Sequence, residues 1–206
     1  MFYISDTVTR SWKIFKQEWT KILAAFAVMV VISIIFNWLG TLVKDQNQGL
    51  VGLLSLVSVI INLVIGMGFT KFMLGVSRGE KPELAQIVKI NPSVLVKYVL
   101  GTLLYAVIVM VGFILLIVPG VYFAMKYMYI PYLIVDTGMG PREAMKLSGK
   151  MTKGIKLDLF ASSLAIGVLM YCGILLLVVG LLITVPVGTL ATLMIYDMAL
   201  MRAEKA

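Results

Sequence analysis

A single lysine lies within one of the most apolar stretches of this sequence, and its charge calls for a chemical explanation. Lys126 occurs in "LLIVPGVYFAMKYMYIPYLIVD", residues 115–136, six residues after Gly120 and with no acidic residue near it. If this stretch crosses a membrane, Lys126 is close to mid-span, where an unsatisfied cation costs about 2.5–3.5 kcal/mol. We therefore expect its ammonium group to face the interior of a helical bundle or a water-filled cavity.

Two roles are open for Lys126: a structural polar contact, or a ligand site. The candidate ligand-binding residues are Lys126, Asn62 and Tyr127, and further hydroxyls that could contact the ammonium group belong to Tyr105, Ser162 and Ser163. An anionic lipid headgroup or another anion is the natural ligand of such a site, because a lysine binds anions as a compact point charge.

The other reactive residue types argue against catalysis. The sequence has no histidine, and its one cysteine, Cys172, lies in an apolar run. Histidine is the commonest general base and the commonest metal ligand in proteins. The acidic residues Asp136, Glu143 and Asp158 adjoin a basic stretch, where we expect solvated ion pairs. The sequence thus predicts a protein that is not an enzyme, with no catalytic residues, no metal site and no cofactor.

The elements that position Lys126 are predicted to be membrane-spanning helices. The chain has 206 residues, of which 61% are hydrophobic and 14% charged. Apolar runs of about 20 residues recur, and this is the length that crosses a bilayer as a helix. We predict one all-α transmembrane domain, residues 1–206, with six spans: 22–40, 50–70, 98–118, 121–135, 159–179 and 181–198. Tight turns are predicted at Pro119–Gly120, in "VPG", and at residues 178–180, "VVG", since proline and glycine disfavour continued helix.

The basic residues predict how these spans are oriented. All but two of the 18 lysines and arginines lie before the first span, after an even-numbered span, or after the last one; the exceptions are Lys44 and Lys126. Because basic loops stay in the cytoplasm, both termini are predicted to be cytoplasmic. The predicted basic cytoplasmic surface includes Lys13, Lys16, Lys89, Lys97, Arg142, Lys146, Lys150, Lys153 and Lys156. Its expected partners are membrane lipids with anionic headgroups, and nucleic acid is not needed to explain its charge.

The basic stretches also suggest an internal repeat. "PELAQIVKINPSVLVKYVL", from Pro82, resembles "PREAMKLSGKMTKGIKLDLF", from Pro141, and the N-terminal "SWKIFKQEWTKIL" resembles part of the latter. Chance similarity between apolar sequences is the alternative. The repeat predicts three units, each a short amphipathic cytoplasmic segment followed by a helical hairpin. Units that enter the membrane in the same sense are related by an axis along the membrane normal.

These motifs resemble a known group of proteins. "RSWKIFKQEWTKILAAFAV", the "VPGVY" motif at 118–122, Lys126 and the "GMGPREAMKLS" segment at 138–148 are similar to DUF975-like and YciC-type prokaryotic inner-membrane proteins. They also resemble the membrane domain attached to some glycerophosphodiester phosphodiesterases. Lysine stands at 126 where that pattern commonly has arginine. The resemblance implies a multi-pass protein of the prokaryotic cytoplasmic membrane and does not imply catalysis.

Three functions are compatible with these features. The first is a non-enzymatic membrane module that binds anionic lipid, a partner protein or further copies of itself. The second is a small transporter or permease component with a ligand site near Lys126. The third is a membrane protein that confers immunity or resistance in a peptide-producing locus, which only genome context would support.

Overall fold

The computed structural model describes residues 4–42, 48–89, 91–175 and 177–205, and within these ranges it contains helices and no strand. Lys44, the predicted exception to the one-sided charge distribution, lies outside the described residues. The elements are α1 (Ile4–Leu42), α2 (Gln48–Ser77), the 3-10 helix η1 (Leu84–Ile87), α3 (Pro92–Leu115), α4 (Ile117–Tyr127), α5 (Ile130–Thr137), α6 (Pro141–Met151), α7 (Lys156–Leu175) and α8 (Leu177–Glu204).

Four stretches of helix are long and apolar enough to cross a membrane: Ser5–Phe36, Val51–Ser77, Pro92–Leu115 and Gly180–Glu204. Helices α6 and α7 meet the same criterion together but are bent by 98° relative to each other, which gives up to five crossings by length and composition. The chain is therefore an all-helical protein suited to a membrane.

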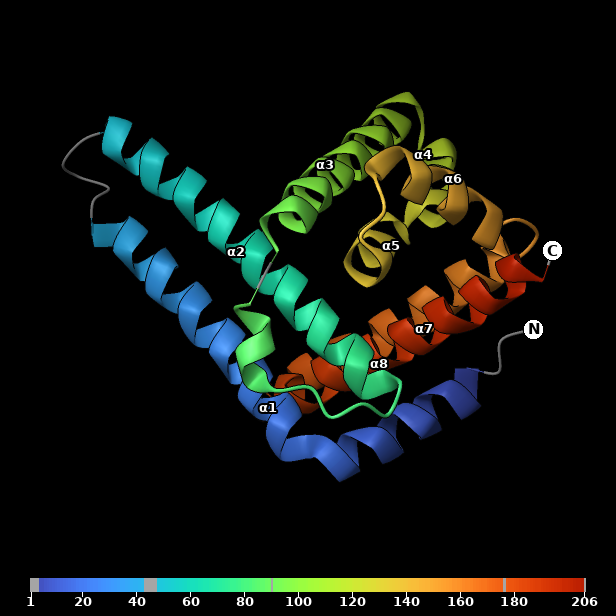
Figure 1. Ribbon diagram of the computed structural model, residues 1–206, viewed down its shortest axis with the longest axis horizontal. Coiled ribbons are helices and arrows are strands. Elements are labelled where there is room, and N and C mark those ends of the chain that lie inside the picture. Colours follow the sequence, from blue (N-terminus) through green and yellow to red (C-terminus); the bar gives the residue numbers. More distant parts are fainter. Residues whose placement is uncertain (1–3, 43–47, 90, 176, 206) are drawn as a thin grey trace.

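The amphipathic start and the first predicted span form one continuous helix with a kink. Inside α1 the backbone of Glu18 leaves helical geometry, with φ −118° and ψ 23°. The kink separates the basic, Trp-containing N-terminal part from the apolar remainder, and Figure 1 shows α1 sharply bent. On the N-terminal part, the ammonium group of Lys16 lies 5.2 Å from the ring centroid of Trp12.

The break between helices that is predicted at Pro119–Gly120 lies about three residues earlier in the structure, at Leu116. Helix α3 ends at Leu115, Leu116 is extended (φ −172°, ψ 160°), and Pro119 and Gly120 lie inside α4. A proline ring clashes with the carbonyl four residues before it. Pro119 therefore prevents helix from continuing through Leu115, but fits the first turn of α4, where N–H groups have no intrahelical partner.

The stretch predicted as a fourth span, 121–135, is divided into α4 and α5. The break falls at Met128 and Tyr129, just before Pro131 in the first turn of α5. Pro131 cannot donate a hydrogen bond to the carbonyl of Tyr127, so the proline ends one helix and begins another rather than kinking a single span. With 11 residues, α4 is about 16 Å long, well short of a bilayer core.

The turn predicted at 178–180 also differs, since these residues lie inside α8. The connection between α7 and α8 is residue 176, which is outside the described residues. The small residue Gly180 is buried within the helix.

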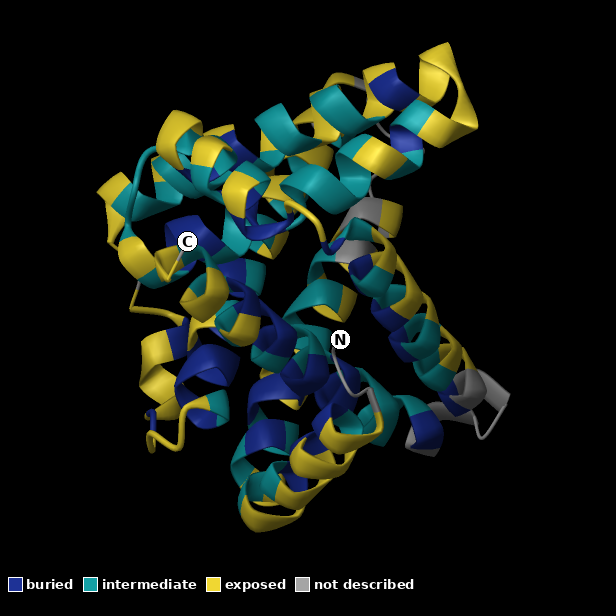
Figure 2. Ribbon diagram, turned by 90° about the vertical axis from the view of Figure 1, so that its right-hand side faces the viewer, coloured by how far each residue is buried: buried dark blue, intermediate teal, exposed yellow. Residues whose placement is uncertain are grey.

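The helices pack mainly in pairs that are adjacent in sequence. Figure 1 shows α1 beside α2, α3 beside α4, and α7 beside α8, in agreement with their contacts. Helix α8 also packs on α1, and α4 contacts α6 and α7, so that the three pairs form one body. The core consists of fully buried apolar side chains, among them Ile22, Phe72, Leu133, Leu159 and Leu190. In Figure 2 the buried segments concentrate in the body of the molecule, and many outer helical faces are exposed.

Candidate functional site

Lys126 lies in the last turn of α4 and not in the middle of a continuous span. Its side chain is half-buried and crosses α6 near Gly149, where an added Cβ would be 3.6 Å from the Cε atom of Lys126. The prediction of one continuous helix around Lys126 is wrong, because α4 ends one residue after it. A lysine in the last turn of a helix also faces the negative end of the helix dipole, which favours its charge.

Helix α6 fixes the end of α4 by two hydrogen bonds to one carbonyl group. The hydroxyl of Ser148 donates to the Lys126 carbonyl oxygen at 3.0 Å, and that of Thr152 is shared between the same oxygen, at 3.2 Å, and the carbonyl of Ser148, at 3.0 Å. Both hydroxyl residues are fully buried. They satisfy a carbonyl group that the end of α4 leaves without a helical partner. Lys126 is thus positioned through its backbone, while its ammonium group contacts the side chain of Tyr127.

A second lysine approaches the same place from α7. The Nζ atom of Lys156, the first residue of α7, lies 3.9 Å from the centroid of the Tyr122 ring. The Nζ atom of Lys126 lies 6.0 Å from the same centroid and 4.9 Å from that of Tyr127. Such cation–π contacts stabilise an ammonium group by about 0.5–1 kcal/mol at exposed positions. We call these four residues, Lys126, Lys156, Tyr122 and Tyr127, the lysine cluster.

The third predicted ligand-binding residue, Asn62, belongs to a different contact. Its side-chain oxygen accepts a hydrogen bond from Ser33 of α1 at 2.8 Å, and its amide nitrogen donates to the carbonyl of Ser58. Asn62 therefore links α1 and α2, whereas Lys126 lies among α4, α6 and α7. Of the predicted trio, the structure brings Lys126 and Tyr127 together and places Asn62 elsewhere.

A network of charges that no local sequence pattern indicates joins three segments of the chain. Arg78, just after α2, donates to both carboxylate oxygens of Asp136 in α5, at 2.6 and 2.8 Å. It also donates to Asp197 in α8, at 2.7 Å. The hydrogen bonds that Arg78 donates to Asp136, and then those it donates to Asp197, raise the pKa of its guanidinium above the usual value. Arg78 is therefore fixed in its charged form and holds α5 and α8 together. We call these three residues the arginine network.

Buried aromatic rings support the arginine network from the core side. The hydroxyl of Tyr196 donates to Asp136 at 2.8 Å. The Tyr196 ring packs 5.6 Å from Tyr129 and 6.0 Å from Tyr132, measured between centroids. Nearby, the ammonium group of Lys97 donates to the carbonyl of Gly138, which ends α5 in the left-handed conformation. The start of α3 and the ends of α2 and α5 are thus tied together by polar contacts.

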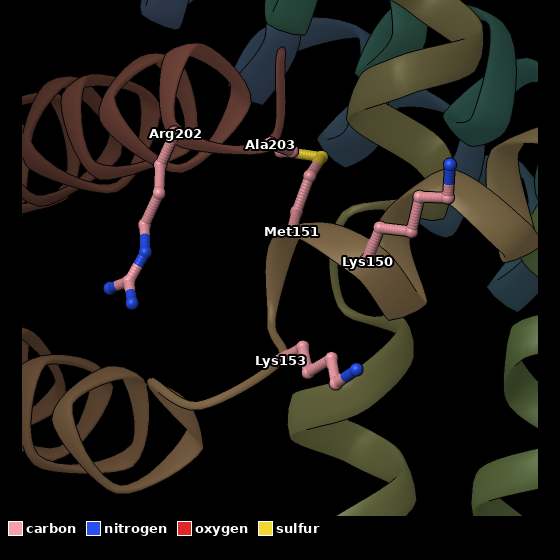
Figure 3. A pocket seen from close by; sticks show the side chains of 5 residues that line it. All are labelled: Lys150, Met151, Lys153, Arg202 and Ala203. Atoms are coloured by element: carbon pink, nitrogen blue, oxygen red, sulfur yellow. The ribbon is translucent and has the colours of Figure 1, made fainter. Parts of the chain in front are cut away.

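A third feature is a pocket of about 320 Å³ between the α6–α7 turn and the end of α8. It is lined by Lys150, Met151, Lys153, Arg202 and Ala203. Figure 3 shows Arg202 extending into the open space, whereas the ammonium groups of Lys150 and Lys153 point away from it. Two members of the predicted basic surface therefore border this pocket, but only one guanidinium faces into it.

The sequence signal for each feature differs in strength. Lys126 stands out as a lone charge among apolar residues. Lys156 appears only as one of many basic residues, and nothing in the sequence pairs it with Tyr122. Arg78 is separated by 58 residues from Asp136 and by 119 from Asp197, so no local pattern reveals the arginine network. The similar endings "LIVD" and "MIYD" of residues 133–136 and 194–197 are the available hint that the two aspartates have related positions.

Comparison with models of protein families, with curated proteins and with solved structures finds no match to this chain. The resemblance to DUF975-like and YciC-type proteins stays a prediction.

Proposed function

We propose that this chain is a non-enzymatic, multi-pass membrane protein that binds anionic lipid headgroups at the lysine cluster. The observation that carries the proposal is the convergence of Lys126 and Lys156 on one tyrosine ring without an acidic partner. Within the described residues, the ion pairs are Lys21 with Glu18 and Arg78 with Asp136 and Asp197. The two clustered lysines carry uncompensated charge in a protein built for a membrane, and an anionic headgroup supplies the missing counter-charge.

The proposal includes a topology. We propose six passes arranged as three hairpins, in a prokaryotic cytoplasmic membrane, with both termini in the cytoplasm. Contacts between the basic stretches support it: Arg78 reaches Asp136 and Asp197, Lys97 reaches Gly138, and Arg202 lies near Gly154, 4.0 Å from the site of an added Cβ. Stretches proposed to lie on one side of the membrane are thus in contact, although they are far apart in sequence.

Native mass spectrometry of gently extracted protein tests lipid binding. We expect the wild type to retain anionic phospholipid and Lys126→Met to retain much less, because the variant removes charge without shortening the side chain severely. Lys81→Met is the matched control, since Lys81 is exposed and lies outside the lysine cluster. Equal lipid retention by wild type and Lys126→Met, at equal thermal stability, would contradict the proposal and direct the search to protein partners.

A further inference from the structure

The lysine cluster brings together two positive charges from separate helices. Lys126 ends α4 and Lys156 begins α7, and both ammonium groups lie within 6.0 Å of the centroid of the Tyr122 ring. The backbone of Lys126 is tied to α6 by Ser148 and Thr152. Both lysines are half-buried, so their stems are packed while the ammonium groups can adjust by rotation.

The acidic residues of the neighbouring helices do not neutralise these lysines. The carboxylate of Glu143 on α6 accepts a hydrogen bond from the backbone N–H of Gly140 at 3.2 Å, where it caps its own helix. Asp158 is two residues after Lys156, and residues at this spacing do not share a helix face. Among the described residues, neither Lys126 nor Lys156 forms an ion pair. The cluster therefore presents about two positive charges.

An exposed apolar stripe on α7 begins beside Lys156. It consists of Leu157, Phe160, Leu164, Val168 and Tyr171, which recur every three or four residues and so share one face of the helix. Leu157 is 83% exposed and Tyr171 is 73% exposed. In the proposed topology α7 crosses the membrane, and such a face is then covered by acyl chains. A lipid whose headgroup contacts Lys156 can therefore lay an acyl chain along this stripe, which favours a lipid over a soluble anion.

We propose that Lys126 and Lys156 select the phosphomonoester headgroup of a membrane lipid over phosphodiester headgroups. This inference rests on the proposed lipid-binding function and specifies its ligand. A phosphomonoester carries about −1.5 to −2 charge at neutral pH and three acceptor oxygens, whereas a phosphodiester carries a single charge. Two lysines with three donors each match the former. The second ammonium group attracts a dianionic headgroup more strongly than a singly charged one, because the Coulomb energy is proportional to the charge on each partner.

A competition experiment tests the selectivity. Purified full-length protein is incubated in detergent with equimolar phosphatidic acid, a phosphomonoester, and phosphatidylglycerol, a phosphodiester, and the retained lipids are counted by native mass spectrometry. We expect the wild type to favour phosphatidic acid by about tenfold, which corresponds to 1.4 kcal/mol. Lys126→Met and Lys156→Met should each bring the ratio close to one. Lys81→Met, which changes an exposed lysine outside the cluster, should leave the ratio unchanged.

Each outcome separates the inference from the function on which it rests. If both lipids bind equally to the wild type and are lost equally from the two cluster variants, lipid binding stands and the phosphomonoester selectivity is wrong. If neither lipid binds, both proposals fail.

Displacement of phosphatidic acid by inorganic phosphate at similar concentration would show a site for free phosphate and overturn the lipid assignment. A loss of selectivity in Lys81→Met as well would overturn the role of the cluster. If Lys126→Met unfolds, Lys156→Met decides the matter alone.

Discussion

At the scale of the residue, the guanidinium of Arg78 has the most demanding role, since it serves two carboxylates at once. Its side chain is 35% exposed, while those of Asp136 and Asp197 are 11% and 19% exposed. The two-pronged contact with Asp136 requires the planar fork of arginine, which lysine cannot reproduce. The arginine network therefore depends on the shape of the cation as well as on its charge.

Replacement of Arg78 by methionine should destabilise the protein by about 1–3 kcal/mol. The variant leaves two largely buried carboxylates without a counter-charge, and partial exposure of the site reduces the cost through solvent screening. Thermal unfolding in detergent measures the effect. Arg142→Met, which removes an exposed arginine of α6, is the control and should change stability little.

Two further variants test whether the charges act as a network. Arg78→Lys should recover part of the stability, because it restores the charge without the fork. Asp136→Asn combined with Arg78→Met should be less destabilising than the sum of the two single changes, since coupled residues are not additive. Strict additivity would show that Arg78 and Asp136 contribute independently.

At the scale of the element, glycine determines how closely η1 approaches α2. A Cβ added at Gly68 would collide with the backbone carbonyl of Ile87, whereas one added at Gly66 meets nothing within 4 Å. Both glycines are in the same helix, two residues apart, and they differ only in what lies against them. They provide a matched pair for measuring the packing of η1.

Gly68→Ala should destabilise the protein by about 1–3 kcal/mol, because the obstacle is backbone and η1 must move. Gly66→Ala should instead stabilise it by about 0.5–1 kcal/mol, since alanine favours helix over glycine. Thermal unfolding of the two variants side by side gives the comparison. A neutral Gly68→Ala would mean that η1 is not held against α2 at Ile87.

The helices could be predicted from the sequence better than their ends. Long apolar runs predict α1, α2, α3 and α8, because hydrophobicity over about 20 residues is a strong signal. The turn is predicted at Pro119 but lies one helical turn before it. The reason is that the proline ring clashes with the carbonyl four residues earlier, whereas proline itself fits the first turn of the next helix. Lys126 stands out in the sequence as a charge among apolar residues, whereas its place at the end of a helix depends on the break before α5. Its neighbour Lys156 and the arginine network depend on tertiary packing, which a single sequence does not display.

At the scale of the whole molecule, the proposed topology makes opposite predictions for different loops. In a Cys172→Ala background, Lys44→Cys should react with a membrane-impermeant thiol reagent in intact cells. Lys146→Cys and Lys205→Cys should react only after the membrane is permeabilised. The reason is that six passes return the chain to the cytoplasm after the second, fourth and sixth crossings.

The pattern of labelling also separates six passes from fewer. External labelling of Lys146→Cys would mean that α4 and α5 together do not cross the membrane. Labelling of Lys44→Cys and Lys205→Cys from the same side would mean an odd total number of crossings. Either result would replace the six-pass topology, while the packing of the helices against one another would be unaffected.

The arginine network has a consequence for the proposed three-unit repeat. One unit supplies a guanidinium and the other two supply carboxylates. Three identical copies of any single unit would bring like charges together at this point, and the copies would repel one another. A symmetric ancestor made of three equal units could not have contained the network. If the three units arose by duplication of one ancestral unit, the charges at these positions diverged before the network formed, and each unit is now confined to its own place in the assembly.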